Sequence, residues 1–421
     1  MALGEGCPQA YAPLEELMRR RLGRDCLYVP SCRLGLYVAL RHWCPPGGRV
    51  LMSPVNDDVI FFVVLAAGLR PVQAPLRADD GTIDTTAVPD SVWDGLSAVL
   101  TTNLYGNPDP APELRARCDR LGIPLLEDAA HAIGTVVAGR PVGSFGDASV
   151  FSLSKHTGAG TGGFLTVADP AAREELARAR DELLTPSRLS AELVHGLRPY
   201  AEAAVRGLRL TGAARAALRL LGFEERTDIR MALRPEELAR ALAPTPSLDA
   251  FDSWVRVDMH SYRLVPGRVG SRRTQRLLLR LDERLAAHLA GTQRLLDTPW
   301  AAPRPGPAQP LFRVPLLVED RDAAAAALAR HRITVGHLYD PPLDVYAGDR
   351  FTDASPAPSA AAWFARHALP VDPLQADRVA AVLDRSGVRP ARPPGAASVR
   401  VPTRIPANVL RDPPRVRRSP R

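Results

Sequence analysis

The sequence contains very little lysine. Of its 54 lysine and arginine residues, 53 are arginine, and Lys155 is the only lysine. Arginine replaces lysine as a surface cation or phosphate ligand, but its guanidinium stays protonated and does not condense with an aldehyde. A single retained lysine is therefore a candidate for amine chemistry. Chance retention is the alternative, and the surrounding residues have to distinguish the two.

Other absences narrow the class of protein. The five cysteines form no CxxC pair and no zinc-like group with histidine, so we expect free thiols, no metal site and a reduced, cytoplasmic environment. No basic segment followed by an apolar run marks a secretory signal at the N-terminus. No apolar stretch approaches the length of a membrane span, and we predict no membrane association. The 46% hydrophobic and 24% charged residues are typical of a soluble globular protein.

The net charge of +8 is concentrated near the C-terminus, where residues 389–421 combine arginine with proline. Such a composition buries too little apolar surface to fold, so we predict a disordered tail. Binding of RNA or a membrane by this tail is the alternative. We favour a solvated tail and predict no nucleic-acid partner.

Short apolar runs alternate with helical stretches between residues 28 and 170. The expected helices lie between several of these runs, and the stretch 112–122 ends in glycine, as a helix C-cap does. Strands alternating with helices indicate an α/β domain with a largely parallel sheet. The predicted strands are 49–54, 98–106, 123–130, 148–154 and 163–169.

The remainder divides into a helical stretch and a second α/β pattern. Residues 185–255 are rich in Ala, Arg, Leu and Glu and are expected to form amphipathic helices, and 273–296 a long helix. The second pattern consists of a strand over 311–320, a helix over 321–332, a strand over 333–340 and a helix over 373–387. We therefore predict a large domain over 1–265 with an insertion at about 185–255, a small C-terminal domain over 266–388, and the tail.

The residues with the clearest chemistry lie between 123 and 169. Asp128 ends a predicted strand, at the edge where ligands bind in open parallel sheets. A carboxylate there can keep a pyridine nitrogen protonated, although a helix N-cap is the alternative for Asp128. Glu127 precedes it on the strand and points to the opposite face, so the two are not an acid/base pair.

Lys155 follows the next strand, so we expect its amine at the same sheet edge as Asp128. The glycine-rich run 158–163 comes directly after it and leads into a strand. A dinucleotide-binding fingerprint would open a helix instead. A turn that lets the backbone pass close to a cofactor fits better.

These motifs carry a resemblance. EDAAHAIG (127–134), GRPVGSFGDASVFSLSK (139–155) and the TGG that follows resemble the DegT/DnrJ/EryC1/StrS family of pyridoxal-phosphate (PLP) aminotransferases, and the resemblance covers most of 28–385 outside the insertion. It implies a type I fold, with a large mixed or parallel-sheet α/β domain and a smaller C-terminal α/β domain. It also implies a homodimer with a shared active site, and transfer of an amino group from an amino-acid donor to a keto-sugar nucleotide or a natural-product keto intermediate.

The family's residue roles carry over by position. Lys155 would form the Schiff base with pyridoxal 5'-phosphate and later move the substrate proton. Asp128 would pair with the pyridine nitrogen, and His131 would lie near the 3-oxygen of the ring, with an ordinary core histidine as the alternative. Ser152 would contact the phosphate. The phosphate turn at a helix start would be Ser31, Cys32 and Arg33, and Ser261 would reach the partner subunit's cofactor.

Four departures from the family touch this pocket. Lys155 comes two positions early, which a short deletion before it explains. Ser31-Cys32-Arg33 stands where the family reads Ser-Gly-Thr, and Ser261-Tyr262-Arg263 where it commonly reads Asn-Tyr-Arg. Asn56 and Asp57 occupy the position of the aromatic residue that covers the ring. We expect the cofactor to be retained, while substrate and reaction type are open.

His156 adds an alternative. Some family members replace the lysine by histidine and catalyse a dehydration, but the spacing to Gly162 and Gly163 favours Lys155 as the Schiff-base residue. His156 is then a second base or a loop residue. The leading hypothesis is an aminotransferase; a dehydratase-like PLP enzyme and a non-catalytic partner subunit are the alternatives, and retention of Lys155 and Asp128 argues against the last.

Overall fold

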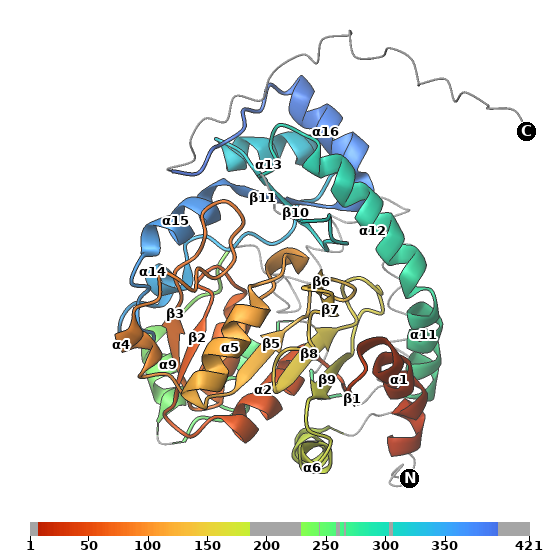
Figure 1. Cartoon of the computed structure of the whole chain (residues 1–421), viewed down its shortest axis with the longest axis vertical. Helices are drawn as coiled ribbons and strands as arrows, with labels where there is room; N and C mark the ends of the chain where they lie inside the picture. The colour runs from red at the N-terminus through yellow and green to blue at the C-terminus, as the bar shows by residue number, and fades with distance from the viewer. Residues whose placement is uncertain are drawn as a thin grey trace, which may run out of the picture.

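A seven-stranded sheet forms the centre of the larger part of the molecule (Figure 1). The computed structural model describes residues 7–185, 229–243, 245–257, 262–264, 267–302 and 306–394. The strands of the sheet are β1 (Asp25–Val29), β2 (Arg49–Met52), β3 (Arg70–Gln73), β4 (Ala98–Thr101), β5 (Leu125–Asp128), β8 (Ala148–Ser152) and β9 (Gly163–Val167). Their order is β1-β9-β8-β5-β4-β2-β3.

The sheet is mixed. Strands β3, β2, β4, β5 and β8 run parallel to one another, whereas β9 is antiparallel to both of its neighbours, β8 and β1. Every residue of β4, β5, β8 and β9 is buried, as expected for strands covered on both faces. The predicted α/β class and five of these strands are confirmed, while β1 and β3 were not predicted.

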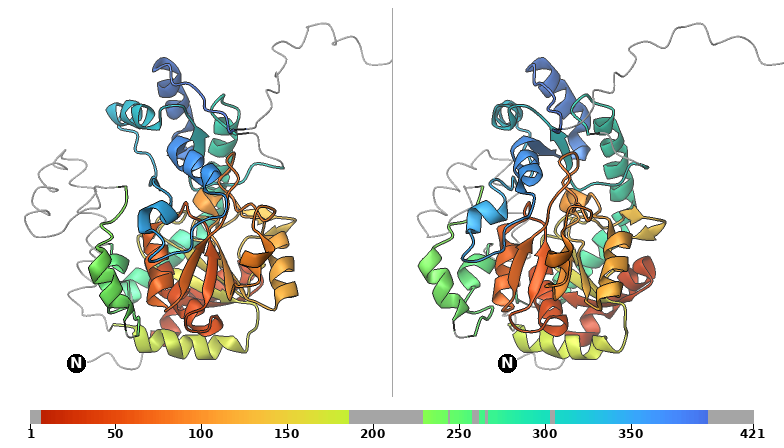
Figure 2. Two further views of the ribbon diagram at one scale, coloured as in Figure 1. Left: turned by 90° about the vertical axis from the view of Figure 1, so that its left-hand side faces the viewer. Right: turned by 60° about the vertical axis from the view of Figure 1, so that its left-hand side comes forward.

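Helices cover both faces of the sheet. On one face lie α2 (Cys32–Trp43), α3 (Asp58–Ala66), α6 (Ala172–Leu183), α9 (Pro235–Leu242) and α10 (Asp252–Val255), which pack with Val150 and Leu165. On the other lie α1 (Cys7–Leu22), α4 (Asp90–Trp93) and α5 (Ala111–Leu121). Phe151 and Phe164 pack on this second face, because neighbouring strand residues point to opposite sides. Figure 2 shows α9 and α5 on opposite sides of the strands.

A smaller layer lies above the sheet in the view of Figure 1. Strands β10 (Val314–Leu317) and β11 (Ala368–Val371) pair antiparallel, and α13 (Arg321–Arg330) and α16 (Ala376–Arg385) pack with them around a separate core. The connecting elements are α14 (Leu343–Ala347), α15 (Pro358–His367) and η2 (Pro373–Gln375). The expected C-terminal α/β pattern is therefore present, but its second strand is β11.

The strand predicted over 333–340 is wrong. The amide of Gly336 donates to the carbonyl of Pro370 at 2.7 Å, but proline has no N–H to return the second bond of a strand pair. The single helix predicted over 273–296 is also wrong, because α11 (Arg268–Leu279) and α12 (Leu281–Leu296) meet at Arg280.

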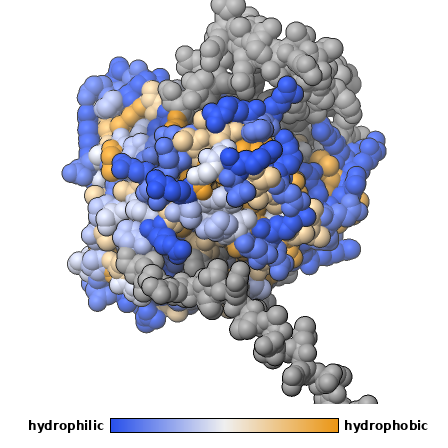
Figure 3. Space-filling view, turned by 90° about the horizontal axis from the view of Figure 1, so that it is seen from above, coloured by the Kyte–Doolittle hydropathy of each residue, from blue (hydrophilic) through white to orange (hydrophobic). Residues whose placement is uncertain are grey.

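Parts of the predicted organisation fall outside the described residues. Residues 186–228 of the predicted insertion and the tail from 395 onward belong to these parts, so the insertion, the tail and the boundary near 265 stay predictions. Among the described residues, no helix is long and apolar enough to cross a membrane. Seen from above, the visible surface is mainly hydrophilic, with apolar residues scattered over it (Figure 3).

Candidate functional site

The carboxyl edge of the parallel strands collects the polar residues of the candidate site. Asp128 is the last residue of β5, and Lys155 follows β8, the neighbour of β5 in the sheet. Asp57 follows β2, and Asn103 follows β4, which lies between β2 and β5. Because parallel strands end at one edge, these residues come together from distant parts of the sequence.

Side-chain hydrogen bonds hold the loops of this edge together. Asn56 Nδ2 donates to Thr102 Oγ1 at 3.2 Å, and Asn103 Nδ2 donates to the Asp128 carbonyl at 3.0 Å. The buried Asp109 carboxylate accepts from the amides of Thr102 and Asn103 at 2.7 and 3.2 Å. Asn103 has a left-handed backbone with a φ of 44°, which asparagine tolerates better than most residues. The positions of Asp128 and of the β2 loop are thereby fixed by the turn after β4.

The Asp128 carboxyl group is buried, with 4% of the residue exposed. It accepts from the amide of Ala130 at 3.0 Å, and the Cys32 thiol lies 3.9 Å from its Oδ1. Burial raises the pKa of Asp128 from 3.8 to about 7, against the hydrogen bond from Ala130 and the charge of Lys155, which lower it. A carboxyl group of this kind takes up or releases a proton near neutral pH.

Lys155 lies in the loop after β8 and is half-buried. Its Nζ is 5.5 Å from the centre of the Phe312 ring. Burial lowers the pKa of the Lys155 amine, and the Asp57 carboxylate gives the largest effect in the opposite direction. A lowered pKa increases the fraction of neutral amine, which is the nucleophilic form.

His131 belongs to a column of parallel rings beside the amine. Its ring centre is 5.2 Å from that of Phe312 and 6.4 Å from that of Tyr105, and Tyr105 in turn stacks on Tyr339 at 5.8 Å. Burial and the charge of Lys155 hold the pKa of His131 well below its usual value, so the imidazole is neutral at neutral pH. His131 is therefore close to Lys155, whereas Phe312 and Tyr339 were not predicted as site residues.

The predicted phosphate residues lie at the N-terminus of α2 and point in different directions. Ser31 caps the helix, accepting from the Leu34 amide at 3.2 Å, and its hydroxyl is 3.1 Å from the Tyr262 carbonyl. Cys32 faces Asp128. Arg33 donates to the Val255 carbonyl at 2.7 Å, with its guanidinium 5.7 Å from the Tyr262 ring.

Ser152 and Ser261 are the other two residues that were predicted to contact the phosphate. The Ser152 hydroxyl is buried at the end of β8 and lies 2.9 Å from the hydroxyl of Ser154. Ser261 lies outside the described residues. The phosphate roles of Ser31, Arg33, Ser152 and Ser261 stay predictions.

Glu127 faces away from this site, as its position next to Asp128 predicted. Its carboxylate accepts from the amides of Gly143, Phe145 and Gly146 at 2.8, 2.7 and 2.6 Å. The residue is buried, and burial raises the pKa of Glu127 while the three amides lower it. Glu127 therefore orders the loop between β5 and β8.

Two of the glycines after Lys155, Gly162 and Gly163, are needed for packing within the protein. A Cβ on Gly162, which has a φ of +93°, would come within 2.6 Å of the Tyr28 hydroxyl. A Cβ on Gly163 would come within 2.4 Å of the Phe151 carbonyl oxygen. The close approach expected at this turn is thus an approach of backbone to β1 and β8.

His156 is buried against the segment before β10. Its Nε2 lies 2.9 Å from the Pro310 carbonyl, and its ring centre is 4.9 Å from that of His288. Burial and His288 lower the pKa of His156 to about 3, so this side chain is neutral at neutral pH. These contacts favour the interpretation as a loop residue that ties the Lys155 loop to the smaller layer.

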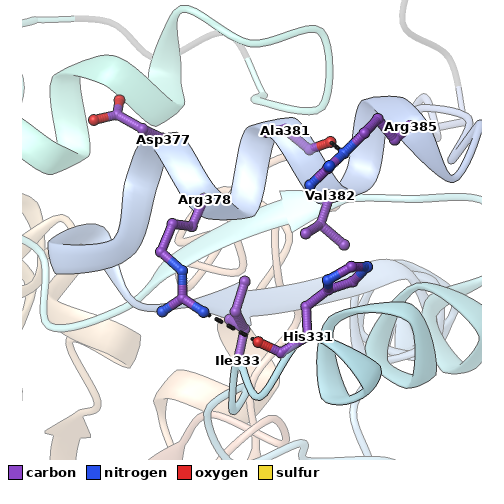
Figure 4. Close-up of a pocket in the computed structure, with 7 residues that line it drawn as sticks. All are labelled: His331, Ile333, Asp377, Arg378, Ala381, Val382 and Arg385. Carbon is purple, nitrogen blue, oxygen red and sulfur yellow. Dashed lines mark hydrogen bonds between the residues drawn. The ribbon is translucent and has the colours of Figure 1, made fainter.

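A surface pocket of about 270 Å³ lies elsewhere, between α16 and the loop after α13 (Figure 4). Its polar rim is engaged with the backbone: Arg378 donates to the His331 carbonyl at 3.0 Å and Arg385 to the Ala381 carbonyl at 3.0 Å. None of the predicted site residues lines it. In the part of the chain that the structure describes, no group of three or more His, Cys, Asp or Glu residues could hold a metal ion.

Part of the chain is similar in sequence to known proteins. Residues 12–196 match the model of the DegT/DnrJ/EryC1/StrS aminotransferase family. The spore coat polysaccharide biosynthesis protein SpsC of Bacillus subtilis is 33% identical over 157 residues, which are 37% of this chain and 39% of the relative. The dTDP-3-amino-3,4,6-trideoxy-alpha-D-glucose transaminase of Streptomyces venezuelae is 29% identical over 175 residues, 41% of this chain and 44% of the relative. The chain thus matches less than half the length of each curated relative.

The likeness in fold extends further than the likeness in sequence. The structure of the E. coli GDP-4-keto-6-deoxy-D-mannose-3-dehydratase with bound hydrated PLP superposes with a TM-score of 0.61 at 17% identity. The match covers 91% of this chain and 92% of that one. The expected type I aminotransferase fold is confirmed by this likeness.

Proposed function

Because residues 12–196 match the model of the DegT/DnrJ/EryC1/StrS aminotransferase family, we propose that the protein is a PLP-dependent aminotransferase. It moves an amino group from an amino-acid donor such as glutamate to a keto substrate. The observation that carries the proposal is the placement of the only lysine and a buried carboxyl group with a pKa of about 7 at one sheet edge.

The residues of this edge fit PLP. Lys155 supplies an amine for the aldehyde, and Asp128 a buried acid for the pyridine nitrogen. The N-terminus of α2 offers backbone N–H groups and a favourable dipole to a phosphate, and Arg33 adds a cation there. PLP, when bound, supplies an electron sink for the bond-breaking at the substrate carbon.

The side chains around the PLP site would each have a separate role in the reaction. Asp128 holds a proton at the pyridine nitrogen, because its buried carboxylate favours a cation beside it. Lys155, whose pKa burial lowers, would as the neutral amine take the proton from the substrate α-carbon and give it to the C4′ carbon of the cofactor, which regenerates the neutral amine. The neutral His131 can donate or accept one hydrogen bond without adding charge to the pocket.

The acceptor we propose is a keto-sugar nucleotide or a related natural-product keto intermediate. The name of the Streptomyces venezuelae relative, a transaminase of a dTDP-sugar, supports this class. The homodimer with a shared site belongs to the same proposal and follows from the family resemblance. The cytoplasmic location, also part of the proposal, follows from the unpaired pattern of the five cysteines.

A dehydratase-like reaction is the second candidate, since the dehydratase structure shares the fold. The presence of Asp57 in place of a covering aromatic residue supports a pocket with altered chemistry. His156 gives this candidate no support, because its Nε2 faces the Pro310 carbonyl and its ring packs on His288.

The proposal is tested by adding L-glutamate to protein reconstituted with PLP. An aminotransferase converts the absorbance of the lysine-bound cofactor to that of the amine form and releases one equivalent of 2-oxoglutarate per site. Lys155→Ala abolishes this conversion, and the exposed Arg385→Ala leaves it unchanged. No conversion with glutamate or any other amino donor would refute the aminotransferase, and failure to take up PLP would favour a non-catalytic subunit.

A further inference from the structure

Phe312 belongs to the segment before β10 in the smaller layer and reaches the candidate site. Its amide donates to the Tyr105 carbonyl at 2.9 Å, and the amide of Arg313 donates to the same carbonyl at 3.1 Å. Two residues before Phe312, the carbonyl of Pro310 lies 2.9 Å from Nε2 of His156. Contacts with the loops after β4 and β8 therefore fix the backbone of this segment at the site.

The Phe312 ring contacts three residues of the site. Lys155 Nζ lies over the ring, 5.5 Å from its centre. The imidazole of His131 is nearly parallel to the ring, at 17°, with the two centres 5.2 Å apart, and His156 meets the ring edge-on at 5.6 Å. The smaller layer thus supplies an aromatic face to the amine.

The loop after β2 has polar residues where the family resemblance places an aromatic one. Asn56 and Asp57 occupy this position. Asn56 Nδ2 donates to Thr102 Oγ1 at 3.2 Å, and the Asp57 side chain caps α3, accepting from the Val59 amide at 3.1 Å. The aromatic surface at Lys155 therefore comes from the smaller layer instead of this loop.

The Phe312 ring is itself restrained by the next residue in the chain. The guanidinium of Arg313 lies 4.3 Å from the ring centre. Arg313 Nη1 donates to the Phe312 carbonyl at 3.0 Å and is 3.5 Å from Oδ1 of Asp372. The lysine side chain, in contrast, is a flexible four-carbon stem. A restrained ring face limits the positions that the amine at the end of this stem can take, and it attracts the amine when it is charged.

We propose that Phe312 is the positioning residue of Lys155: its ring face holds the amine at the carboxyl edge of the sheet and supplies the aromatic surface that the β2 loop lacks. Because Nζ is the atom that would bond to the cofactor, Phe312 then forms part of the cofactor pocket and couples this pocket to the smaller layer. The role toward the cofactor rests on the proposed function, whereas the contact between ring and amine does not.

The single lysine makes the contact directly measurable. Reductive methylation of the full-length, ligand-free protein with ¹³C-formaldehyde labels Lys155 and the terminal α-amine. Protons over an aromatic face resonate upfield, so we expect the methyl protons of Lys155 to lie upfield of their position in the urea-unfolded protein. Phe312→Leu retains an apolar side chain but removes the ring, and the upfield displacement should be lost. Phe312→Tyr, which keeps a ring, should retain it.

Phe351→Leu is the matched control. Phe351 also has a guanidinium over its ring, at 5.3 Å from the centre. Two residues further on, Asp353 pairs with Arg70 at the start of β3, which places this part of the chain at the opposite edge of the sheet from Lys155. We expect Phe351→Leu to leave the methyl resonance of Lys155 unchanged.

Cofactor loading of the unmodified protein gives a second measurement. The neutral amine adds to the aldehyde of PLP, releases one water and forms the imine, so the rate depends on the neutral fraction and on the position of the amine. At a pH above the pKa of Lys155 in both proteins, the neutral fractions are equal. We then expect imine formation to be about tenfold slower in Phe312→Leu than in the wild type, and to be restored in Phe312→Tyr.

An unchanged methyl resonance of Lys155 in Phe312→Leu would overturn the proposal, and so would equal rates of imine formation in this variant and the wild type. If Phe312→Leu fails to fold, Phe312→Met, which is also apolar and has no ring, gives the same test. The methyl resonance needs no cofactor. A protein that takes up no PLP therefore refutes the proposed function, while the resonance still decides whether the ring contacts the amine.

Discussion

Replacing Asp128 by asparagine should change how the stability of the ligand-free protein depends on pH. Burial raises the pKa of this carboxyl group from 3.8 to about 7. A pKa raised by folding means that the folded state binds the proton more tightly than the unfolded state does. The stability that this proton contributes is complete below pH 4 and is lost as the pH rises to about 7.

The magnitude follows from the change in pKa. Each pKa unit corresponds to about 1.4 kcal/mol, so a change of about three amounts to about 4 kcal/mol. Asparagine has nearly the same shape and cannot ionise. We therefore expect the free energy of unfolding of Asp128→Asn, relative to the wild type, to increase by about 4 kcal/mol between pH 4 and pH 7 and to stay constant above that.

The difference between the two proteins is the quantity to measure, because other buried groups act in the opposite direction. Folding lowers the pKa of His156 to about 3, and its contribution makes the wild type more stable as the pH rises toward 6.5. Urea unfolding of both proteins at a series of pH values cancels this contribution. The exposed Asp94→Asn serves as the control. A difference between Asp128→Asn and the wild type that is constant or decreases from pH 4 to pH 7 would show that Asp128 is not a buried, proton-binding acid.

Three further substitutions test the packing around the site by urea unfolding. Arg230→Met removes the guanidinium that faces the buried Asp58 carboxylate and should lower the free energy of unfolding by about 3–5 kcal/mol. In a double-mutant cycle, adding Asp58→Asn should recover part of this loss, and strictly additive effects would contradict the pairing. Glu127→Gln replaces one carboxylate oxygen, which accepts hydrogen bonds from backbone amides, by an NH₂ group that can only donate. It should lower the free energy of unfolding by about 1–3 kcal/mol, and an unchanged stability would contradict the role of Glu127 in ordering the loop. Gly163→Ala should prevent folding, because its Cβ would lie 2.4 Å from the Phe151 carbonyl oxygen. Gly160→Ala has no atom within 4 Å of its Cβ, so it should cost only the about 1–2 kcal/mol of its positive φ of 85° and still yield folded protein.

The sequence was sufficient to predict the edge of the sheet that carries the site. Short apolar runs alternating with helical stretches marked β4, β5, β8 and β9. Asp128 ends one of these strands and Lys155 follows another, which placed both at one edge. β1 and β3 escaped prediction because DCLYV and RPVQ are short and contain charged or polar residues and proline. The strand predicted over 333–340 failed because strand pairing depends on the partner, and Pro370 cannot complete it.

Contacts between distant segments could not be predicted from local patterns. The ring column around His131 joins Tyr105, Phe312 and Tyr339, which the fold brings together from both layers. The Arg230–Asp58 ion pair spans 172 residues. Only His131 had been predicted as a site residue. The contacts of the other residues could not be predicted, because each is an ordinary aromatic or charged residue until its partner is known.

The central claim is that Lys155 carries PLP. The most direct test supplies the full-length protein with PLP, reduces it with borohydride and maps the modified peptides by mass spectrometry. Because Lys155 is the only lysine, we predict a single modified peptide that contains it, with no pyridoxyl label in Lys155→Ala. No stable label after reduction, or a label only at the terminal α-amine, would contradict the account.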